Sequence, residues 1–386
     1  MFSKKSATLL AISTLLSVSN VYAAPNIGTV TGSLATGGIV QITGSGFGST
    51  GPNIDLFDEF SGNSTSKAGD VVSLTASDAG SWSSYGTYQP TYDTNFHSPP
   101  FSMRTFANDR MQQLQKNVNS TTEAFISYWI SLPQGSTFPG STVIGSYPAS
   151  GASYWKLAWI MDGPTGYQSG GTGDDICLPT YPDNTYWRLM GNNTPLNFPV
   201  GRRDTDDWFT FNGWMRLSVW LKGGAIPTVD PGSIWFQALT EGNRLKEYTG
   251  NAVLFNGGSN GIAQWTRINF PGWYGGTTAT NVNLRPVYDD IYVATGPGAV
   301  ARVEIGDAPD YASCKNLALL LPKSWSDGSI SAEVHTGSFV ANAQAYVYVF
   351  DANNVHNTVG FPVSLSGQST STVFSPPQNL RVISSK

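Results

Sequence analysis

The sequence predicts an all-β protein built from antiparallel strands, and two observations support this prediction. Charged residues make up only 12% of the 386 residues, whereas the chain contains 42 glycines and 23 prolines. This composition favours short strands joined by turns, because the exposed faces of long helices need Glu, Lys and Arg. Apolar side chains also recur with a period of two in several segments, which is typical of antiparallel strands with one buried face.

Three segments show this alternation most clearly, at residues 123–133, 214–222 and 345–352. In the first, Ala124, Ile126, Tyr128, Ile130 and Leu132 share one face. In the second, one face carries Met215, Leu217, Val219 and Leu221, and the other carries Trp214, Arg216, Ser218, Trp220 and Lys222. We expect the apolar faces to form a core. One stretch, residues 108–118, is compatible with a helix, although its pattern is irregular.

The first 23 residues have the features of a bacterial-type secretory signal peptide. Lys4 and Lys5 precede an apolar run at residues 7–18, and small residues follow up to Ala24. The apolar run is too short to span a bilayer, and no later segment is long enough. We therefore expect a secreted protein without a membrane span. The formal charge of −5 gives no electrostatic reason to expect nucleic acid or an anionic membrane as a partner.

Only two cysteines are present, Cys177 and Cys314. In an oxidising compartment they could form a disulfide, and the alternative is two separate buried thiols. Neither cysteine lies in a spacing that builds a metal site.

Residues 37–48, GGIVQITGSGFG, resemble the first strands of the IPT/TIG immunoglobulin-like family. In that family a strand runs into a Gly-x-Gly-Phe-Gly turn, whose glycines permit positive φ. The strands that would follow are found far downstream, at residues 301–339 and 345–363. The resemblance implies one module split into residues 24–52 and 298–368, with a large domain inserted between them and a tail at 369–386. A surface turn tolerates such an insertion when the inserted domain's own ends lie close together.

The predicted insert, residues 53–297, opens with NIDLFDEF and closes with VYDDIYVATG. In jelly-roll sandwiches the first and last strands commonly lie side by side, as an insertion requires. Four segments, HSPPFSMRTF, FISYWISLP, NGWMRLSVWLKG and YDDIYVATG, resemble the concanavalin A-like lectin/glucanase jelly roll, a fold shared by laminin G-like modules and several polysaccharide lyases. The expected fold is thus an antiparallel jelly-roll β-sandwich inserted into a smaller immunoglobulin-like β-sandwich.

Several catalytic patterns are absent from the sequence. It contains no Gly-x-x-x-x-Gly-Lys-Ser/Thr phosphate loop and no His-Glu-x-x-His zinc helix. None of its six glutamates lies in the Glu-x-Asp-x-Glu strand with which retaining glucanases of this fold place two carboxylates beside the scissile bond. Hydrolysis by that mechanism is not expected.

The resemblance implies that a glycan would bind on the concave face of the jelly roll. Aromatic rings cover the apolar faces of sugars, while Arg and Lys bind hydroxyls and carboxylates. The candidate ligand-binding residues are Arg104, Lys156, Arg188, Trp214, Arg216 and Trp220. We expect an extracellular, acidic polysaccharide as the partner. The alternative for each aromatic is core packing, and for each cation an ion pair with a neighbouring carboxylate.

Two alternative functions remain open. A polysaccharide lyase would cleave a uronate-containing glycan by β-elimination, which requires a neutraliser, a base and an acid. Tyr154 or Tyr186 could act as acid and base, with Lys156, Arg188 or Arg216 as neutraliser. The alginate lyase signatures with Gln-x-His and Tyr-Phe-Lys-x-Gly-x-Tyr are absent, however. The other alternative is a structural or adhesive surface protein that binds another protein.

The only cofactor considered is calcium, which prefers several oxygen ligands. Asp289 and Asp290 begin a predicted strand, so one of the two must point inward and find partners. They are the candidate metal ligands, and the alternative is that they join the two ends of the inserted domain.

Overall fold

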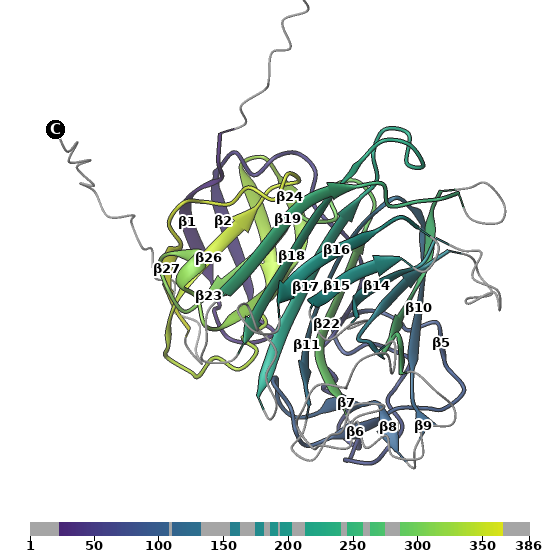
Figure 1. The fold of residues 1–386 in the computed structure, drawn as a ribbon. Coiled ribbons are helices and arrows are strands. Elements are labelled where there is room, and N and C mark those ends of the chain that lie inside the picture. Colours follow the sequence, from purple (N-terminus) through teal and green to yellow (C-terminus); the bar gives the residue numbers. More distant parts are fainter. Residues whose placement is uncertain are drawn as a thin grey trace, which may run out of the picture.

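The structure is a computed structural model, and it describes residues 23–107, 110–132, 155–162, 174–180, 186–191, 194–202, 213–240, 245–257, 263–274 and 286–365. In this part of the chain, β-strands form three large sheets and one two-stranded sheet, β8 (Phe106–Ala107) with β9 (Arg110–Met111). The helical structure among these residues is a single 3-10 turn, Tyr311–Ser313. None of them forms a helix long and apolar enough to cross a membrane. The all-β prediction is confirmed (Figure 1).

Two of the large sheets face each other and form a sandwich. We call them sheet I and sheet II. Sheet I has the strand order β19 (Leu245–Ala252), β18 (Gly232–Thr240), β17 (Trp214–Lys222), β11 (Glu123–Ser131), β22 (Val287–Thr295), β3 (Asn53–Asp58) and β4 (Ala79–Gly80), with β7 (Ser102–Arg104) pairing β22 and β6 (Thr91–Asp93) pairing β7. Sheet II has the order β16 (Asn197–Arg202), β15 (Tyr186–Gly191), β14 (Ile176–Thr180), β13 (Trp159–Met161), β20 (Trp265–Phe270), β10 (Leu114–Thr121) and β5 (Ser84–Tyr85), with β12 (Trp155–Lys156) and β21 (Trp273–Tyr274) alongside.

The core of the sandwich lies between these sheets. The alternating apolar residues of β11 and β17 enter it, and in the antiparallel register Tyr128 lies opposite Leu217 and Ile126 opposite Val219. Sheet II contributes Ile160, Leu178, Trp187, Leu189, Trp265 and Phe270 from the other side. The predicted inner faces of the two strands are therefore confirmed. The stretch at residues 108–118, which the sequence made compatible with a helix, contains strand β9 and the first part of strand β10 in the structure.

The two ends of the 53–297 segment lie side by side. β3 pairs antiparallel with β22, with Leu56 opposite Val293 and Phe57 opposite Tyr292. This confirms the expected pairing of the first and last strands of the sandwich. The exact domain boundaries stay a prediction.

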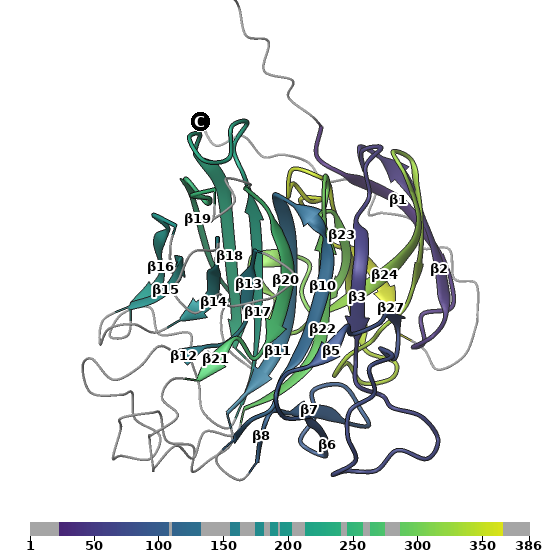
Figure 2. The ribbon, with the colours of Figure 1, turned by 90° about the vertical axis from the view of Figure 1, so that its right-hand side faces the viewer.

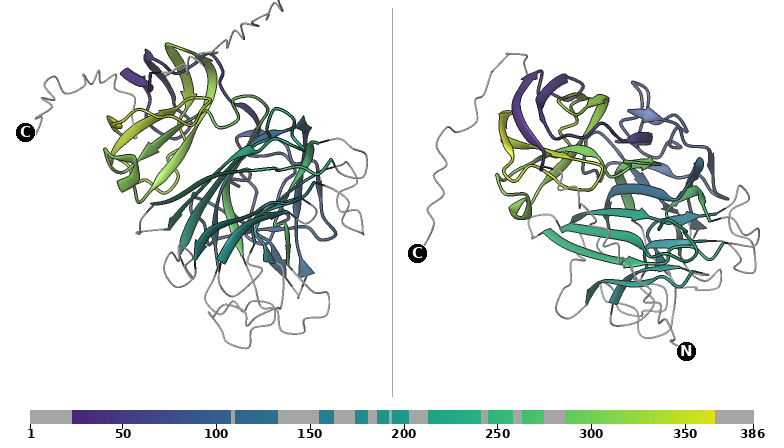
Figure 3. Two further views of the ribbon diagram at one scale, coloured as in Figure 1. Left: turned by 45° about the horizontal axis from the view of Figure 1, so that its top comes forward. Right: turned by 90° about the horizontal axis from the view of Figure 1, so that it is seen from above.

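Strands from both ends of the described chain form the third sheet, which we call the terminal sheet. Its order is β1 (Asn26–Gly32), β2 (Ile39–Ser45), β25 (Ser329–Glu333), β24 (Leu317–Ser326), β23 (Arg302–Gly306), β26 (Gln344–Phe350) and β27 (Phe361–Ser364). Figure 1 shows the purple first strands beside the yellow-green last strands. Figure 3 shows this sheet as a body beside the sandwich.

The terminal sheet has an apolar core of its own. Val40 lies opposite Ala332 and Ile42 opposite Ile330, where β2 meets β25. Phe47 is fully buried between Gly46 and Gly48, which have φ values of 74° and 76°. The expected Gly-x-Gly-Phe-Gly turn therefore has the predicted geometry. Membership of the IPT/TIG family stays a prediction.

Candidate functional site

The outer face of sheet I is covered by the terminal sheet. Arg216, on β17, is only 2% exposed, and its guanidinium nitrogens Nη2 and Nη1 donate to the two carboxylate oxygens of Glu304 on β23 at 2.8 and 3.2 Å. Arg302 donates to the same carboxylate from Nε at 2.6 Å. Arg216 is thus an interface residue, and the expectation that it lines an open glycan-binding face is wrong.

The other candidate ligand-binding residues of sheet I are Trp214, Trp220 and Arg104, and each has a different environment. Trp214 is 7% exposed and packs in an apolar cluster with Tyr311 and Tyr348. Trp220 is half-buried, and its indole N–H donates to Glu123 Oε1 at 3.2 Å. Arg104 is half-buried on β7, opposite Val287 of β22. The face of β17 is therefore covered by the terminal sheet at Trp214 and Arg216, whereas Trp220 is partly covered and Lys222 at the end of the strand is 45% exposed.

The outer face of sheet II carries a continuous row of polar, aromatic and sulfur-containing side chains. Strand pairing places these residues side by side across six strands, in the order Gln115, Asn269, Trp159, Cys177, Met190 and Asn197. Their sequence neighbours belong to the sandwich core, so the row points away from it. Figure 2 labels the strands of sheet II from β16 to β5. Trp159 and Asn269 at the centre are buried, whereas Gln115 is half-buried and Asn197 exposed.

Three cations lie on or beside this row, Lys156, Arg188 and Arg267, and each contacts an aromatic or amide side chain. Lys156 Nζ lies 3.8 Å from the centre of a Trp159 ring. Arg188 lies on β15 two residues before Met190. Its guanidinium carbon is 5.2 Å from the centre of the Tyr186 ring, and its Nη1 donates to Asn197 Oδ1 at 2.8 Å. Cation–aromatic contacts of this length hold both groups in place. Lys156, Arg188 and Tyr186 were expected at the site, and the structure brings all three to one face.

The third cation and the amides of this face were not identified from the sequence. Arg267 Nε donates to Asn117 Oδ1 at 3.0 Å, and burial lowers the pKa of Arg267. Asn269 is 5% exposed, and its Oδ1 has no hydrogen-bond partner within the described part of the chain. The signal that could have found them is a polar residue between two core residues, such as Asn269 between Ile268 and Phe270.

Gln113, which directly precedes β10, adds a further amide beside Gln115. Gln113 Nε2 donates to the carbonyl oxygens of Pro271 and Gly272 at 2.8 and 3.0 Å. Gln115 Nε2 in turn donates to Gln113 Oε1 at 2.8 Å. These bonds fix both amides beside β20 and link them to the segment that carries Asn269.

Cys177 does not supply a reactive thiolate to this face. It is fully buried, and burial raises the pKa of its thiol to about 12. Cys314 is also buried and free, so the two cysteines are separate thiols rather than a disulfide. The remaining expected residue, Tyr154, lies outside the described residues.

Asp289 and Asp290, on β22 of sheet I, hold the loop that contains His97 and Ser98. Asp289 is fully buried, and its Oδ2 accepts the backbone N–H groups of His97 and Ser98 at 2.8 and 2.9 Å. Asp290 Oδ2 accepts the Ser98 hydroxyl and faces His97 Nδ1, both at 2.8 Å. Burial, followed by the charge of Asp290, raises the pKa of Asp289 well above its usual range. Both carboxylates therefore have protein partners, and a calcium role for them stays a prediction.

No family model and no curated protein matches the chain. Among solved structures it is similar to the PL-14 alginate lyase from Aplysia kurodai, with 14% identity, coverage of 54% of this chain and 87% of that one, and a TM-score of 0.39. It is also similar to alginate lyase Aly36B bound to an alginate tetrasaccharide, with 11% identity, 64% and 98% coverage and a TM-score of 0.43. The winged bean acidic lectin has 9% identity, 64% and 94% coverage and a TM-score of 0.29. These likenesses are remote.

Proposed function

We propose that the protein is an exported carbohydrate-recognition protein that binds an acidic polysaccharide on the outer face of sheet II. The observation that carries this proposal is that three cations lie on one face: Arg188 and Arg267 are half-buried there, and Lys156 lies buried beside them at 5% exposure. In a chain of net charge −5 with only 21 Lys and Arg residues, such a grouping is selective for a negatively charged ligand.

The chemistry of this face suits a uronate polymer. Arg188 is half-buried and already oriented by Tyr186 and Asn197, so a carboxylate that pairs with its guanidinium would cost little further loss of side-chain freedom. The competing face, on sheet I, is occupied by the terminal sheet. Sheet II therefore offers the better surface.

The test is retardation of the protein in gels that contain a panel of acidic and neutral polysaccharides. We expect Arg188→Ala and Arg267→Ala each to weaken retention by about tenfold, since a hydrogen bond to a charged group contributes about 1.5–3 kcal/mol. Lys323→Ala is the matched control, because Lys323 is 42% exposed on the terminal sheet and pairs with Glu333. Retention should also fall with added salt. Unchanged retention in both arginine variants would contradict the proposal.

A second candidate is a polysaccharide lyase acting on the same face. The observation that favours it is the pairing of Tyr186 with Arg188, which places a phenol and a guanidinium side by side on the row that Lys156 joins. β-Elimination would use a Tyr as acid or base and a cation to neutralise the uronate carboxylate. A lyase would raise the ultraviolet absorbance of a polyuronate solution by forming unsaturated ends. Tyr186→Phe should abolish that rise in absorbance and keep gel retention. If the parent protein gives no rise, the lyase candidate fails and binding is the only remaining function of this face.

A further inference from the structure

Three side chains meet where the terminal sheet contacts the sandwich, and we call them the junction cluster: Glu59, Asp78 and His335. His335 Nδ1 lies 2.9 Å from Glu59 Oε2 and 3.6 Å from Asp78 Oδ1. One donor atom from each residue lies within 4.8 Å of the others. Glu59 follows β3 and Asp78 precedes β4, while His335 follows β25, so the cluster joins the two bodies of the protein.

The cluster is held in place before any ligand arrives. The backbone N–H of Glu59 donates to Asp78 Oδ2 at 2.8 Å, and the Ser77 hydroxyl donates to the same oxygen at 2.6 Å. The His335 ring packs edge-on against Phe57, with 4.7 Å between ring centres. Asp78 Oδ1 and Glu59 Oε2 are thus both turned toward the imidazole, which is a preorganised donor set.

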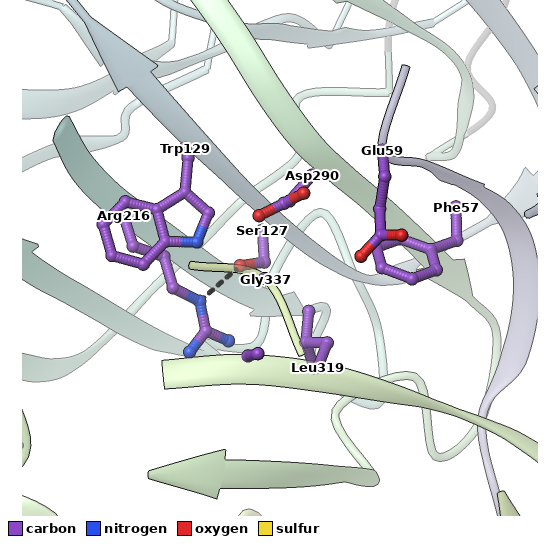
Figure 4. Close-up of a pocket in the computed structure, with 9 residues that line it drawn as sticks. Phe57, Glu59, Ser127, Trp129, Arg216, Asp290, Leu319 and Gly337 are labelled. Atoms are coloured by element: carbon purple, nitrogen blue, oxygen red, sulfur yellow. Dashed lines mark hydrogen bonds between the residues drawn. The ribbon is translucent and has the colours of Figure 1, made fainter. Parts of the chain in front are cut away.

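A second observation points to a missing positive charge at this place. Glu59 lines a cavity of about 10 Å³, roughly the size that holds one water molecule, and Asp290 lines it too. The Asp290 side chain is 10% exposed, and its Oδ1 has no hydrogen-bond partner within the described part of the chain. Figure 4 shows the side chains that line this cavity, with Asp290 between Arg216 and Glu59 in this view. Arg216 is already paired with Glu304, and His97 contacts only the other oxygen of Asp290, so Asp290 Oδ1 is the oxygen left for a water molecule or an ion.

We propose that the junction cluster binds a first-row transition dication such as Zn²⁺, and that the bound ion fastens the terminal sheet to the sandwich. An imidazole nitrogen with two carboxylate oxygens is a ligand set that Zn²⁺ accepts, whereas Ca²⁺ and Mg²⁺ prefer oxygen ligands alone. Ligands about 2.0–2.1 Å from a tetrahedral ion lie about 3.3 Å apart. The observed 2.9 and 3.6 Å lie on either side of that spacing. Water in the adjacent cavity would complete the coordination.

The competing explanation is that no metal ion binds and that His335 is protonated, so that its imidazolium donates a hydrogen bond to Glu59 and joins the two sheets in this way. Both explanations predict that His335 stabilises the junction, so a stability measurement on variants alone does not separate them. Direct metal binding does, because the proton-only junction has no saturable affinity for Zn²⁺.

The experiment uses the untagged full chain, freed of metal with a chelator and then titrated with ZnCl₂ in a calorimeter. We expect about one ion bound per chain and a rise in Tm of several degrees, since a ligand that binds only the folded state raises its stability. A second titration with Co²⁺ should give the visible absorption bands of a tetrahedral ion. His335→Gln should weaken Zn²⁺ binding at least tenfold. The control is His356→Gln, because His356 lies opposite Phe350 of β26 and outside the junction cluster; this variant should bind Zn²⁺ as the parent does.

Asp78→Asn provides the same test if His335→Gln does not fold, because Asp78 is the most exposed member of the cluster, at 11%. Absence of saturable Zn²⁺ binding in the parent would overturn the proposal in favour of the proton. Unchanged binding in both cluster variants would overturn it as well. Equal affinity for Ca²⁺ would contradict the class of metal. None of these results depends on polysaccharide binding, so they leave the function of sheet II to its own test.

Discussion

Replacing Glu304 by glutamine removes the negative charge that joins sheet I to the terminal sheet. The Glu304 side chain is fully buried. It accepts bonds from Arg216 and Arg302 and from the Tyr311 hydroxyl, the last at 2.7 Å. Glutamine keeps the shape of the side chain but leaves two buried guanidinium groups without a carboxylate. The expected result is a less stable protein with an unchanged fold.

Two independent arguments give the size of this loss. Burial alone would raise the pKa of Glu304, but the guanidinium groups of Arg216 and Arg302 outweigh it and hold the pKa at about 2, against a usual value of 4.5. At about 1.4 kcal/mol per pH unit, this difference corresponds to ~3 kcal/mol. Removing one partner of a buried ion pair typically costs about 3–5 kcal/mol. We therefore expect Glu304→Gln to lower the free energy of unfolding by about 3–5 kcal/mol at pH 7.

The assay is urea-induced unfolding at pH 7, followed by tryptophan fluorescence. Glu333→Gln is the control, because Glu333 pairs with Lys323 at the surface, where such pairs contribute about 0–1 kcal/mol. In acid the parent should lose the contribution of Glu304 as the pH falls from about 4.5 toward 2, since the unfolded state binds the proton first. The variant should lack that part of the pH dependence. A loss below about 1 kcal/mol in Glu304→Gln would refute the reasoning.

Three further predictions follow from burial and packing. Cys177 and Cys314 should react with a thiol reagent only after unfolding, because burial raises their thiol pKa values to about 12 and about 11; fast labelling of the folded protein would contradict this. Gly306→Ala should cost about 1–3 kcal/mol of unfolding free energy, since its Cβ would lie 2.6 Å from Cys314 Sγ, while Gly328→Ala, with its nearest contact at 3.4 Å, should cost less; equal midpoints in urea would argue against it. Arg216→Ala should lower the urea midpoint and leave gel retention on acidic polysaccharides intact; lost retention in a folded variant would restore Arg216 as a ligand-binding residue.

The sandwich core and the pairing of its end strands could be predicted because both depend on local pattern. The alternation of β11 and β17 separates an aliphatic face from a face of mixed aromatic and polar residues within nine residues. Opening and closing strands that must meet at a single insertion point leave few other ways to pair, and β3 does pair with β22. These inferences need no knowledge of what lies outside the sandwich.

The candidate site could be predicted only in part because a strand pattern does not say what covers its outer face. Trp214, Arg216 and Trp220 are the residue types of a sugar-binding face, and they are equally the residue types of a buried interface. Lys156, Tyr186 and Arg188 were found by the same reasoning on sheet II, where Tyr186 and Arg188 are half-buried and Lys156 is buried. Asn269 and Arg267 were missed because amides and single cations are common on any solvated strand.

The sequence nevertheless contains a signal for the covered face, and it lies in β23. Arg302 and Glu304 alternate there with Val303 and Ile305, so that both charges share the face opposite the core of the terminal sheet. A chain with six glutamates and 12% charged residues rarely places one in the middle of a strand without a partner. The unmatched arginine in the middle of β17 is the complementary feature. Two strands that each carry an opposite charge on the outer face predict a contact between their sheets, and the 2.8 Å bond from Arg216 to Glu304 is that contact.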